Sequence, residues 1–259
     1  MFDLQAYLLG LAAIAILALA AWLVGSLRRD VTVVDSFWSL FFLVATVTYA
    51  SQVAAPGPRV ALVLGMVALW ALRLAGHLTW RNRGKPEDHR YQAIRRNHEP
   101  HFAWKSLYLV FGLQGILAWV ISLPLLAAVG GQRPLGVWDA AGVALWLTGM
   151  VFEGVSDLQL ARFKARPENH GRVLDHGLWR YTRHPNYFGE CCLWWGYYLI
   201  ALSAGGWWSI ASPLLMTYLL YKVSGVALLE RDIHERRPAY RDYIARTNAF
   251  LPGRPHRAT

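Results

Sequence analysis

The sequence is poor in charge, in cysteine and in recognisable cofactor loops. Of its 259 residues only 16% are charged, whereas about 25% is usual for a soluble domain, so an ordinary soluble protein is excluded. Its two cysteines, Cys191 and Cys192, are neighbours without a CxxC pair or a Cys/His spacing, which argues against a disulfide framework and predicts no metal site. Neither a GxxxxGK[ST] loop nor a GxGxxG motif after a strand occurs, so any nucleotide binds outside a Rossmann domain.

What the sequence has instead is long apolar runs. Hydrophobic residues make up 55% of the chain and include 13 tryptophans. Seven runs approach the roughly 20 residues that a helix needs to cross a bilayer, and they lack the alternation of barrel strands. We therefore expect an all-α integral membrane protein with seven transmembrane helices, forming a single domain over residues 1–259. The expected spans are residues 7–27, 31–53, 60–80, 107–129, 138–157, 187–202 and 207–228.

Lysine and arginine are unevenly distributed between the expected loops. They gather after the first span, in residues 81–106 and 158–186 and in the tail 229–259, whereas the alternate loops hold only Arg59 and Arg133. Because cytoplasmic loops carry the positive excess, we expect the N-terminus outside and the C-terminus in the cytoplasm. No nucleic-acid-binding module carries this charge. It attracts anionic headgroups of membrane lipids, and a second interpretation is that it holds a phosphorylated cofactor.

An acid lies inside the second expected span. Asp35, in VVDSFWSLFF, shares a helical face with Trp38, Phe42 and Tyr49. In one interpretation Asp35 starts a helix and faces water, where it favours the helix dipole. In the other it faces the bundle interior, as intramembrane acids usually do, and meets the polar end of a lipophilic substrate. The aromatic stripe fits helix packing equally well.

Two further pairs of polar residues at four-residue spacing fall within spans. Arg73 and His77 share a face of the third span, and Glu153 and Asp157 share a face of the fifth. Arg73 is a candidate partner for Asp35. The two acids repel each other unless cations or hydroxyl donors lie between them, and such donors occur on a ribose.

The stretch RYTRHPNYFGE, residues 180–190, stands at the start of the sixth span. Pro185 suits a helix start, so we expect a helix from about Asn186 whose free N–H groups can bind an anion. Anchoring at the membrane interface accounts for the arginines and tyrosines. It does not account for His184, Asn186 and Glu190, since an unpaired carboxylate inside a span is costly. We therefore interpret this stretch as a ligand site.

The chain resembles the bacterial proteins of the steroid 5α-reductase-like superfamily through several segments in the same order. These segments are VVDSFW at 33–38, NRGKP at 82–86, VSDLQLARFKARP at 155–167, GLWRYTRHPNYFGE at 177–190 and LERDIHERRPAYRDYIARTNAFLP at 229–252. The resemblance implies a seven-helix membrane reductase that binds NADPH in its cytoplasmic half. It also implies a multi-pass protein of the bacterial inner membrane.

The resemblance implies roles for individual residues. Asp35 takes the place of a substrate-side glutamate, and we expect Asp35 and Arg73 to be catalytic and Trp38 and Phe42 to bind substrate. The expected cofactor-binding residues are Arg83, Lys85, Asp157, Lys164, Arg172, Tyr181, Arg183, His184, Asn186, Tyr187, Glu190 and Arg231. Three positions depart from the family. The segment WALRLAGH lacks the catalytic tyrosine, Glu153 replaces an asparagine, and Gly171 replaces a tyrosine.

The expected reaction is hydride transfer from NADPH to the β-carbon of a conjugated C=C in a lipophilic enone, such as a 3-oxo-4-ene steroid. The expected partners are that substrate, entering from the bilayer, and membrane lipids, without nucleic acid. Asp35 donates to the carbonyl oxygen only if protonated, and Arg73 or a tyrosine can substitute. One alternative is an isoprenylcysteine-carboxyl-type methyltransferase using S-adenosylmethionine, because its proteins share an Arg-His-Pro-x-Tyr stretch. Another is a non-enzymatic lipid-binding protein.

Overall fold

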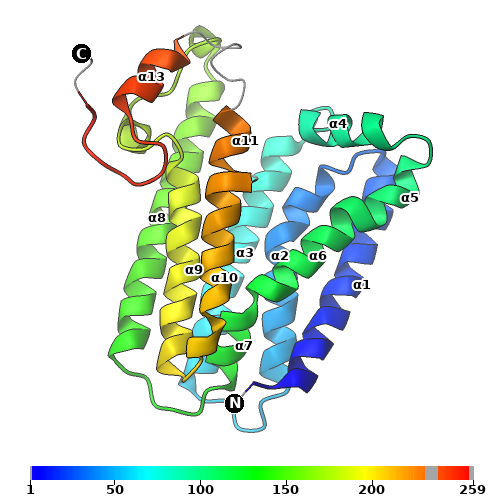
Figure 1. Cartoon of the computed structure of the whole chain (residues 1–259), viewed down its shortest axis with the longest axis vertical. Helices are drawn as coiled ribbons and strands as arrows, with labels where there is room; N and C mark the ends of the chain where they lie inside the picture. Colours follow the sequence, from blue (N-terminus) through cyan, green and yellow to red (C-terminus); the bar gives the residue numbers. More distant parts are fainter. Residues whose placement is uncertain (1, 224, 231–238, 257–259) are drawn as a thin grey trace. The chain divides into compact units, whose positions relative to one another are not determined.

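The computed structural model describes residues 2–223, 225–230 and 239–256, and these residues form helices and loops without a β-strand (Figure 1). The expected all-α class is therefore confirmed for the part of the chain described. The chain divides into two compact units, residues 1–135 with 201–209 and residues 136–200 with 210–259. The expectation of a single domain over residues 1–259 stays a prediction.

The first unit is built around α2. The unit consists of α1 (Leu4–Arg28), α2 (Val33–Ser51), α3 (Pro58–Asn82), α4 (His89–His98), α5 (Phe102–Ser106), the π-helical turn η1 (Leu107–Gly112), α6 (Leu113–Ile121) and α7 (Leu123–Gly130). Helix α2 packs against α1, α3, α6 and α7. The Asp3 carboxylate caps α1 by accepting from the N–H of Ala6 at 2.9 Å, and Pro58 occupies the first turn of α3, as expected of helix starts.

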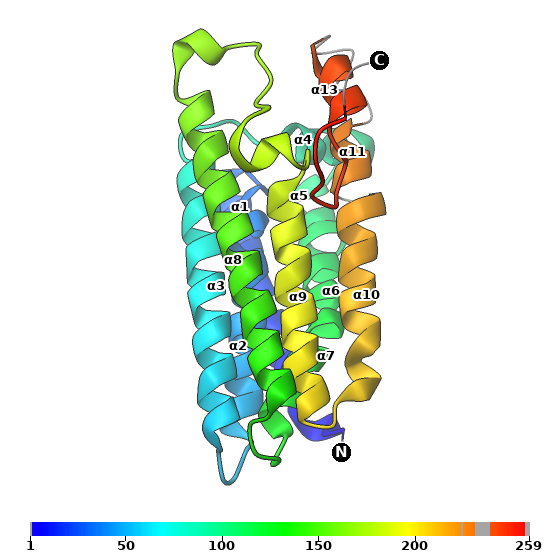
Figure 2. The same cartoon turned by 90° about the vertical axis from the view of Figure 1, so that its left-hand side faces the viewer.

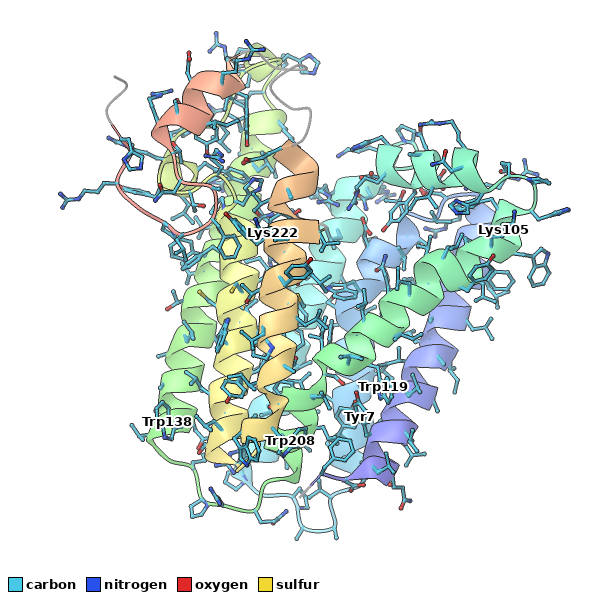
Figure 3. All side chains as sticks on the ribbon, in the orientation of Figure 1. Tyr7, Lys105, Trp119, Trp138, Trp208 and Lys222 are labelled. Atoms are coloured by element: carbon cyan, nitrogen blue, oxygen red, sulfur yellow. The ribbon has the colours of Figure 1, made fainter. Side chains whose placement is uncertain are left out.

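Short helix α4 lies across the end of the first unit where α2 begins and α3 ends (Figure 1). An apolar cluster holds it there, made of Ala21, Trp22, Val31, Val34, Tyr91, Phe102, Val110 and Phe111. The indole N–H of Trp22 also donates to the carbonyl oxygen of Ala103 at 2.7 Å. At the other end of the unit the rings of Tyr7 and Trp119 stack, with centroids 4.2 Å apart (Figure 3).

A buried arginine fixes the end of the first unit that lies away from α4. Arg59 is only 2% exposed. Its guanidinium donates to the carbonyl oxygens of Arg133 at 2.8 Å and Pro134 at 2.9 Å, and to the hydroxyl of Ser203 at 3.2 Å. One buried arginine therefore joins this loop to the start of α3 through hydrogen bonds.

The second unit contains two long helices that lie side by side (Figures 1 and 2). Its elements are α8 (Val137–Lys164), the 3-10 turns η2 (Pro167–Asn169) and η3 (Gly177–Arg180), α9 (Pro185–Ser203), α10 (Ala211–Tyr218), the π-helical turn η5 (Leu219–Val223), α11 (Val226–Glu230) and α13 (Tyr240–Arg246). A Cβ atom placed on Gly149 would lie 2.5 Å from the carbonyl oxygen of Gly189, and one on Gly196 would lie 2.7 Å from that of Gly142. Glycine is therefore what allows α8 and α9 to approach so closely.

Five of the described helical segments are long and apolar enough to cross a membrane: Leu4–Arg28, Val33–Ser51, Pro58–Asn82, Phe102–Ile121 and Val137–Lys164. They overlap the first five expected spans, with the fourth shifted to Phe102–Ile121 from the expected residues 107–129, and they are compatible with a multi-pass membrane protein. Helix α9 is 19 residues long, but its tyrosines, tryptophans, Asn186 and Glu190 lower its hydropathy. Residues 207–228 are divided among several short elements. Seven spans and the orientation of the termini stay predictions.

Candidate functional site

In the first unit the Asp35 carboxylate lies at the centre of a polar cluster. One of its oxygens accepts from the Tyr91 hydroxyl at 2.6 Å, and the other accepts from the Arg90 guanidinium at 3.1 Å. Arg90 also donates to both oxygens of Asp88, at 3.0 and 3.3 Å. The Asp35 side chain is only 14% exposed. A carboxylate that accepts from a cation and from a phenol is held as an oriented acceptor.

The sequence EDHRY, residues 87–91, builds this cluster by fastening the start of α4 to the loop before α2. Asp88 caps α4 by accepting from the N–H of Arg90 at 2.9 Å, and its own N–H donates to the Thr32 hydroxyl at 2.9 Å. Glu87 accepts from the N–H of Val31 at 3.0 Å and from Arg95 at 2.7 Å. The sequence analysis missed Arg90 and Tyr91 as partners of Asp35. The sequence signal that could have indicated these partners is the pair of acids shortly before Arg-Tyr at the start of a helix.

The Tyr91 phenol is arranged to keep its proton. Burial and the neighbouring Asp35 carboxylate raise the pKa of Tyr91 well above its ordinary value. The side-chain amide of Gln114 donates to the Tyr91 oxygen at 3.2 Å, so the phenolic proton is left for Asp35. Tyr91 is therefore a protonated donor beside a buried acid.

The predicted aromatic stripe of α2 takes part in helix packing. The ring of Trp38 meets Phe42 edge-on at a centroid distance of 5.2 Å, and Phe42 lies 5.7 Å from Trp70 of α3. Phe42 is fully buried, whereas Trp38 is partly exposed. Arg73 lies on α3 and is half-buried. The substrate-binding roles of Trp38 and Phe42 and the catalytic role of Arg73 stay predictions.

A cavity of about 340 Å³, lined mostly by residues with polar side chains, opens at the same end of the first unit. It is lined by Asp30, Thr32, Asn82, Lys85, Pro86, Glu87, Asp88, His89 and Gln92. Arg83 and Lys85, both predicted to bind the cofactor, are exposed there at the end of α3. The side-chain nitrogen of Asn82 is buried and has no hydrogen-bond partner among the described residues.

In the second unit Arg183 and His184 are joined by an acid that the sequence analysis did not single out. Glu230, at the end of α11, accepts from Nε and Nη2 of Arg183, each at 2.7 Å, and pairs with Nε2 of His184 at 2.8 Å. Burial alone would raise the pKa of Glu230, but the hydrogen bonds from Arg183 and His184 outweigh it and lower that pKa to about 2. Arg183 is thus engaged inside the protein, and its contact with a cofactor stays a prediction.

The other predicted cofactor residues of the second unit lie on α8, on the loop after it and on α9. The ring of His184 stacks on that of Tyr187 at 5.6 Å. Asp157 is buried on α8, and Asn186 and Glu190 are partly exposed in the first two turns of α9. Three of the predicted cofactor residues in this unit are exposed, namely Lys164, Arg172 and Tyr181. Arg231 lies outside the described residues. α9 begins at Pro185, one residue before the expected start.

A family model described as "Protein of unknown function (DUF1295)" matches residues 21–247. The chain belongs to this family. An uncharacterized protein of Schizosaccharomyces pombe is 24% identical to this DUF1295 chain, over 97% of the chain and 81% of that protein. A shorter similarity links the chain to 3-oxo-5-alpha-steroid 4-dehydrogenase 1 of Bos taurus, 39% identical over 66 residues, or 26% of each protein. No solved structure matches the chain. The family match and the short similarity to the bovine enzyme are consistent with a distant relationship to the steroid 5α-reductase-like superfamily.

Proposed function

We propose that the chain is an NADPH-dependent membrane reductase that reduces the conjugated C=C of a lipophilic enone, such as a 3-oxo-4-ene steroid. The observation that carries the proposal is the Tyr91–Asp35–Arg90 cluster, a protonated phenol held against a buried acid. The similarity to the bovine 3-oxo-5-alpha-steroid 4-dehydrogenase supports the class of reaction. Helices apolar enough to span a bilayer support a substrate that enters from the membrane.

The described residues fit a phosphorylated nucleotide by the chemistry of their donors. In the first unit, exposed Arg83 and Lys85 offer cations, and the buried amide nitrogen of Asn82, on the wall of the polar cavity, still needs an acceptor. In the second unit, exposed Lys164 and Arg172 offer two more cations. Phosphate oxygens accept from such groups. Each unit by itself therefore offers donors that suit phosphate oxygens. NADPH, when bound, would supply the hydride.

The chain's own part in the reaction is to stabilise the charge that develops on the substrate carbonyl oxygen. Such charge is best met by a donor that is already in place. In this proposal the Tyr91 hydroxyl turns from Asp35 to that oxygen, while Arg90 continues to balance the Asp35 carboxylate. Asp35 then acts by orienting the phenol. Tyr91 supplies the tyrosine that the segment WALRLAGH lacks.

Ligand-dependent thermal stability tests the cofactor. A ligand stabilises a protein according to how far its concentration exceeds its dissociation constant, so we expect NADPH to raise the unfolding temperature of the purified protein much more than NADH or S-adenosylmethionine. Stabilisation by S-adenosylmethionine alone would favour the methyltransferase. Stabilisation by none of the three, in protein that unfolds cooperatively, would favour the lipid-binding alternative.

Substitution of Asp35 tests the reaction. Consumption of NADPH is followed by its absorbance with a 3-oxo-4-ene steroid and with a simpler enone. We expect Asp35→Ala to lose most of the turnover and Asp35→Asn to retain more of it, since an amide oxygen still accepts from Tyr91. Equal turnover by the wild type and Asp35→Ala, on a substrate that is demonstrably reduced, would remove the cluster from the mechanism.

A further inference from the structure

Residues 239–256 form a strap over the segment that leads into α9. The N–H of Arg183 donates to the carbonyl oxygen of Asn248 at 2.9 Å, and the N–H of Gly253 donates to that of Tyr181 at 2.9 Å. The Thr182 hydroxyl donates to the carbonyl oxygen of Phe250 at 2.9 Å. Residues far apart in the sequence are thus joined largely through backbone groups.

Side chains of the strap also contact the segment before α9 and α9 itself. The Tyr243 hydroxyl of α13 donates to the carbonyl oxygen of Trp179. The ring of Phe250 lies 6.3 Å from that of Phe188 on α9 and 5.6 Å from that of Tyr221. The strap therefore covers the segment 179–184 and also touches the first turn of α9.

Arg183 connects this strap to Glu230. Its Nη1 atom donates to the carbonyl oxygens of Thr247 and, at 3.3 Å, Ile244 in the strap. Its Nε and Nη2 atoms are directed to the Glu230 carboxylate at 2.7 Å. Because a guanidinium is planar and rigid, the acid on one side fixes the direction of the donors on the other. Only 8% of the Arg183 side chain is exposed, so water competes little for these bonds.

We infer that Glu230 is a positioning residue, which through Arg183 and His184 fastens the strap onto residues 179–184 and orders the first turn of α9. The inference rests on the proposed function only in its consequence, that this order helps the α9 residues Asn186 and Tyr187 to hold a nucleotide. His184 links Glu230 to the first turn of α9, since it pairs with Glu230 and stacks on Tyr187. Its carbonyl oxygen also accepts from the N–H of Phe188 at 3.0 Å.

Hydrogen exchange of backbone amides in the nucleotide-free protein tests the inference directly. In Glu230→Ala we expect the amides of Arg183, Gly253 and Phe188 to exchange about tenfold faster or more, because local opening becomes easier. Glu230→Gln should fall between Ala and the wild type, since its amide keeps one acceptor oxygen, and it carries the test if Glu230→Ala does not fold.

The matched control is Asp175→Asn. Asp175 pairs with Arg246 of the strap at 3.5 Å, but both side chains are nearly half exposed, and exposed pairs contribute little. We expect this variant to exchange like the wild type. Unchanged exchange in Glu230→Ala would overturn the fastening, and faster exchange at Gly253 without any change at Phe188 would overturn the ordering of α9.

Steady-state kinetics then test the consequence separately. If the wild type uses NADPH, we expect Glu230→Gln to raise KM for NADPH by roughly three- to tenfold while kcat changes less, since the change falls on binding. An unaltered KM would overturn the link to the nucleotide. If the wild type neither binds nor uses NADPH, the proposed function fails, and the exchange of Gly253 and Phe188 alone decides the role of Glu230.

Discussion

Replacing Tyr91 by phenylalanine removes the one oxygen on which the proposed mechanism depends. The ring belongs to the apolar cluster beneath α4, so its packing is preserved and the fold should survive. In the proposed transition state the Tyr91 hydroxyl donates to the charged carbonyl oxygen of the substrate, from a buried side chain that otherwise donates to Asp35 at 2.6 Å. A hydrogen bond to a charged group contributes about 1.5–3 kcal/mol, which corresponds to roughly 10- to 100-fold in rate if it acts in the transition state.

The assay follows NADPH consumption with a 3-oxo-4-ene steroid. We expect Tyr91→Phe to lower kcat by roughly one to two orders of magnitude with little change in KM for NADPH, because the loss falls on the transition state. Tyr108→Phe is the matched control, since it removes the same hydroxyl from a side chain of the same unit that is 62% exposed. If Tyr91→Phe reduces the enone as fast as Tyr108→Phe, the phenol is not the donor and the reasoning is refuted.

Three further predictions concern stability, each read from thermal unfolding of purified protein. Gly149→Ala should destabilise the protein by about 1–3 kcal/mol, because the added Cβ would lie 2.5–2.8 Å from backbone atoms of α9. Gly76→Ala is the control, since Gly76 has open space around it. Equal unfolding temperatures for the two variants would contradict the close approach of the helices. The pKa of Glu230 is lowered from 4.5 to about 2 in the folded protein. The ionised carboxylate therefore stabilises the folded state by about 3 kcal/mol above pH 4.5, and this contribution is lost as the pH falls towards 2. Glu230→Gln should remove that acid dependence, and an unchanged profile would show that another group causes it. Arg59→Met should destabilise by about 1–3 kcal/mol, because it removes the hydrogen bonds of a buried guanidinium to the loop. Arg133→Met, at an exposed side chain, should be nearly neutral, and comparable losses in both would argue against the loop anchor.

The first five spans were predictable because each is a long apolar run, and length with hydropathy is a local property. The sixth and seventh apolar runs differ from the expected spans, and the reasons are again local. α9 carries aromatic residues with polar atoms, and residues 219–223 form a π-helical turn between α10 and α11. Hydropathy does not register such a turn, because it depends on backbone hydrogen bonds and not on side-chain polarity.

The candidate site was only half predictable, because its key contacts are distant in sequence. Asp35 was singled out as an acid within a span, but its partners Arg90 and Tyr91 lie 55 and 56 residues away. Glu230 lies 47 residues from Arg183, in a tail where acids and arginines alternate and no spacing distinguishes one acid from another. Residue types therefore indicated chemistry, and only the fold could choose the partners.

The glycines of α8 and α9 also fix the register in which these two helices can pack. Gly142 and Gly149 are seven residues apart, as are Gly189 and Gly196. A straight α-helix drifts by about 20° over each seven-residue repeat. Over a single interval this drift is small, so both glycines of each helix face the same neighbouring helix. Lengthening either helix by one residue between its glycines would rotate the next glycine out of the seam by about 100°, so the pair tolerates substitution on its outer faces better than any insertion within it.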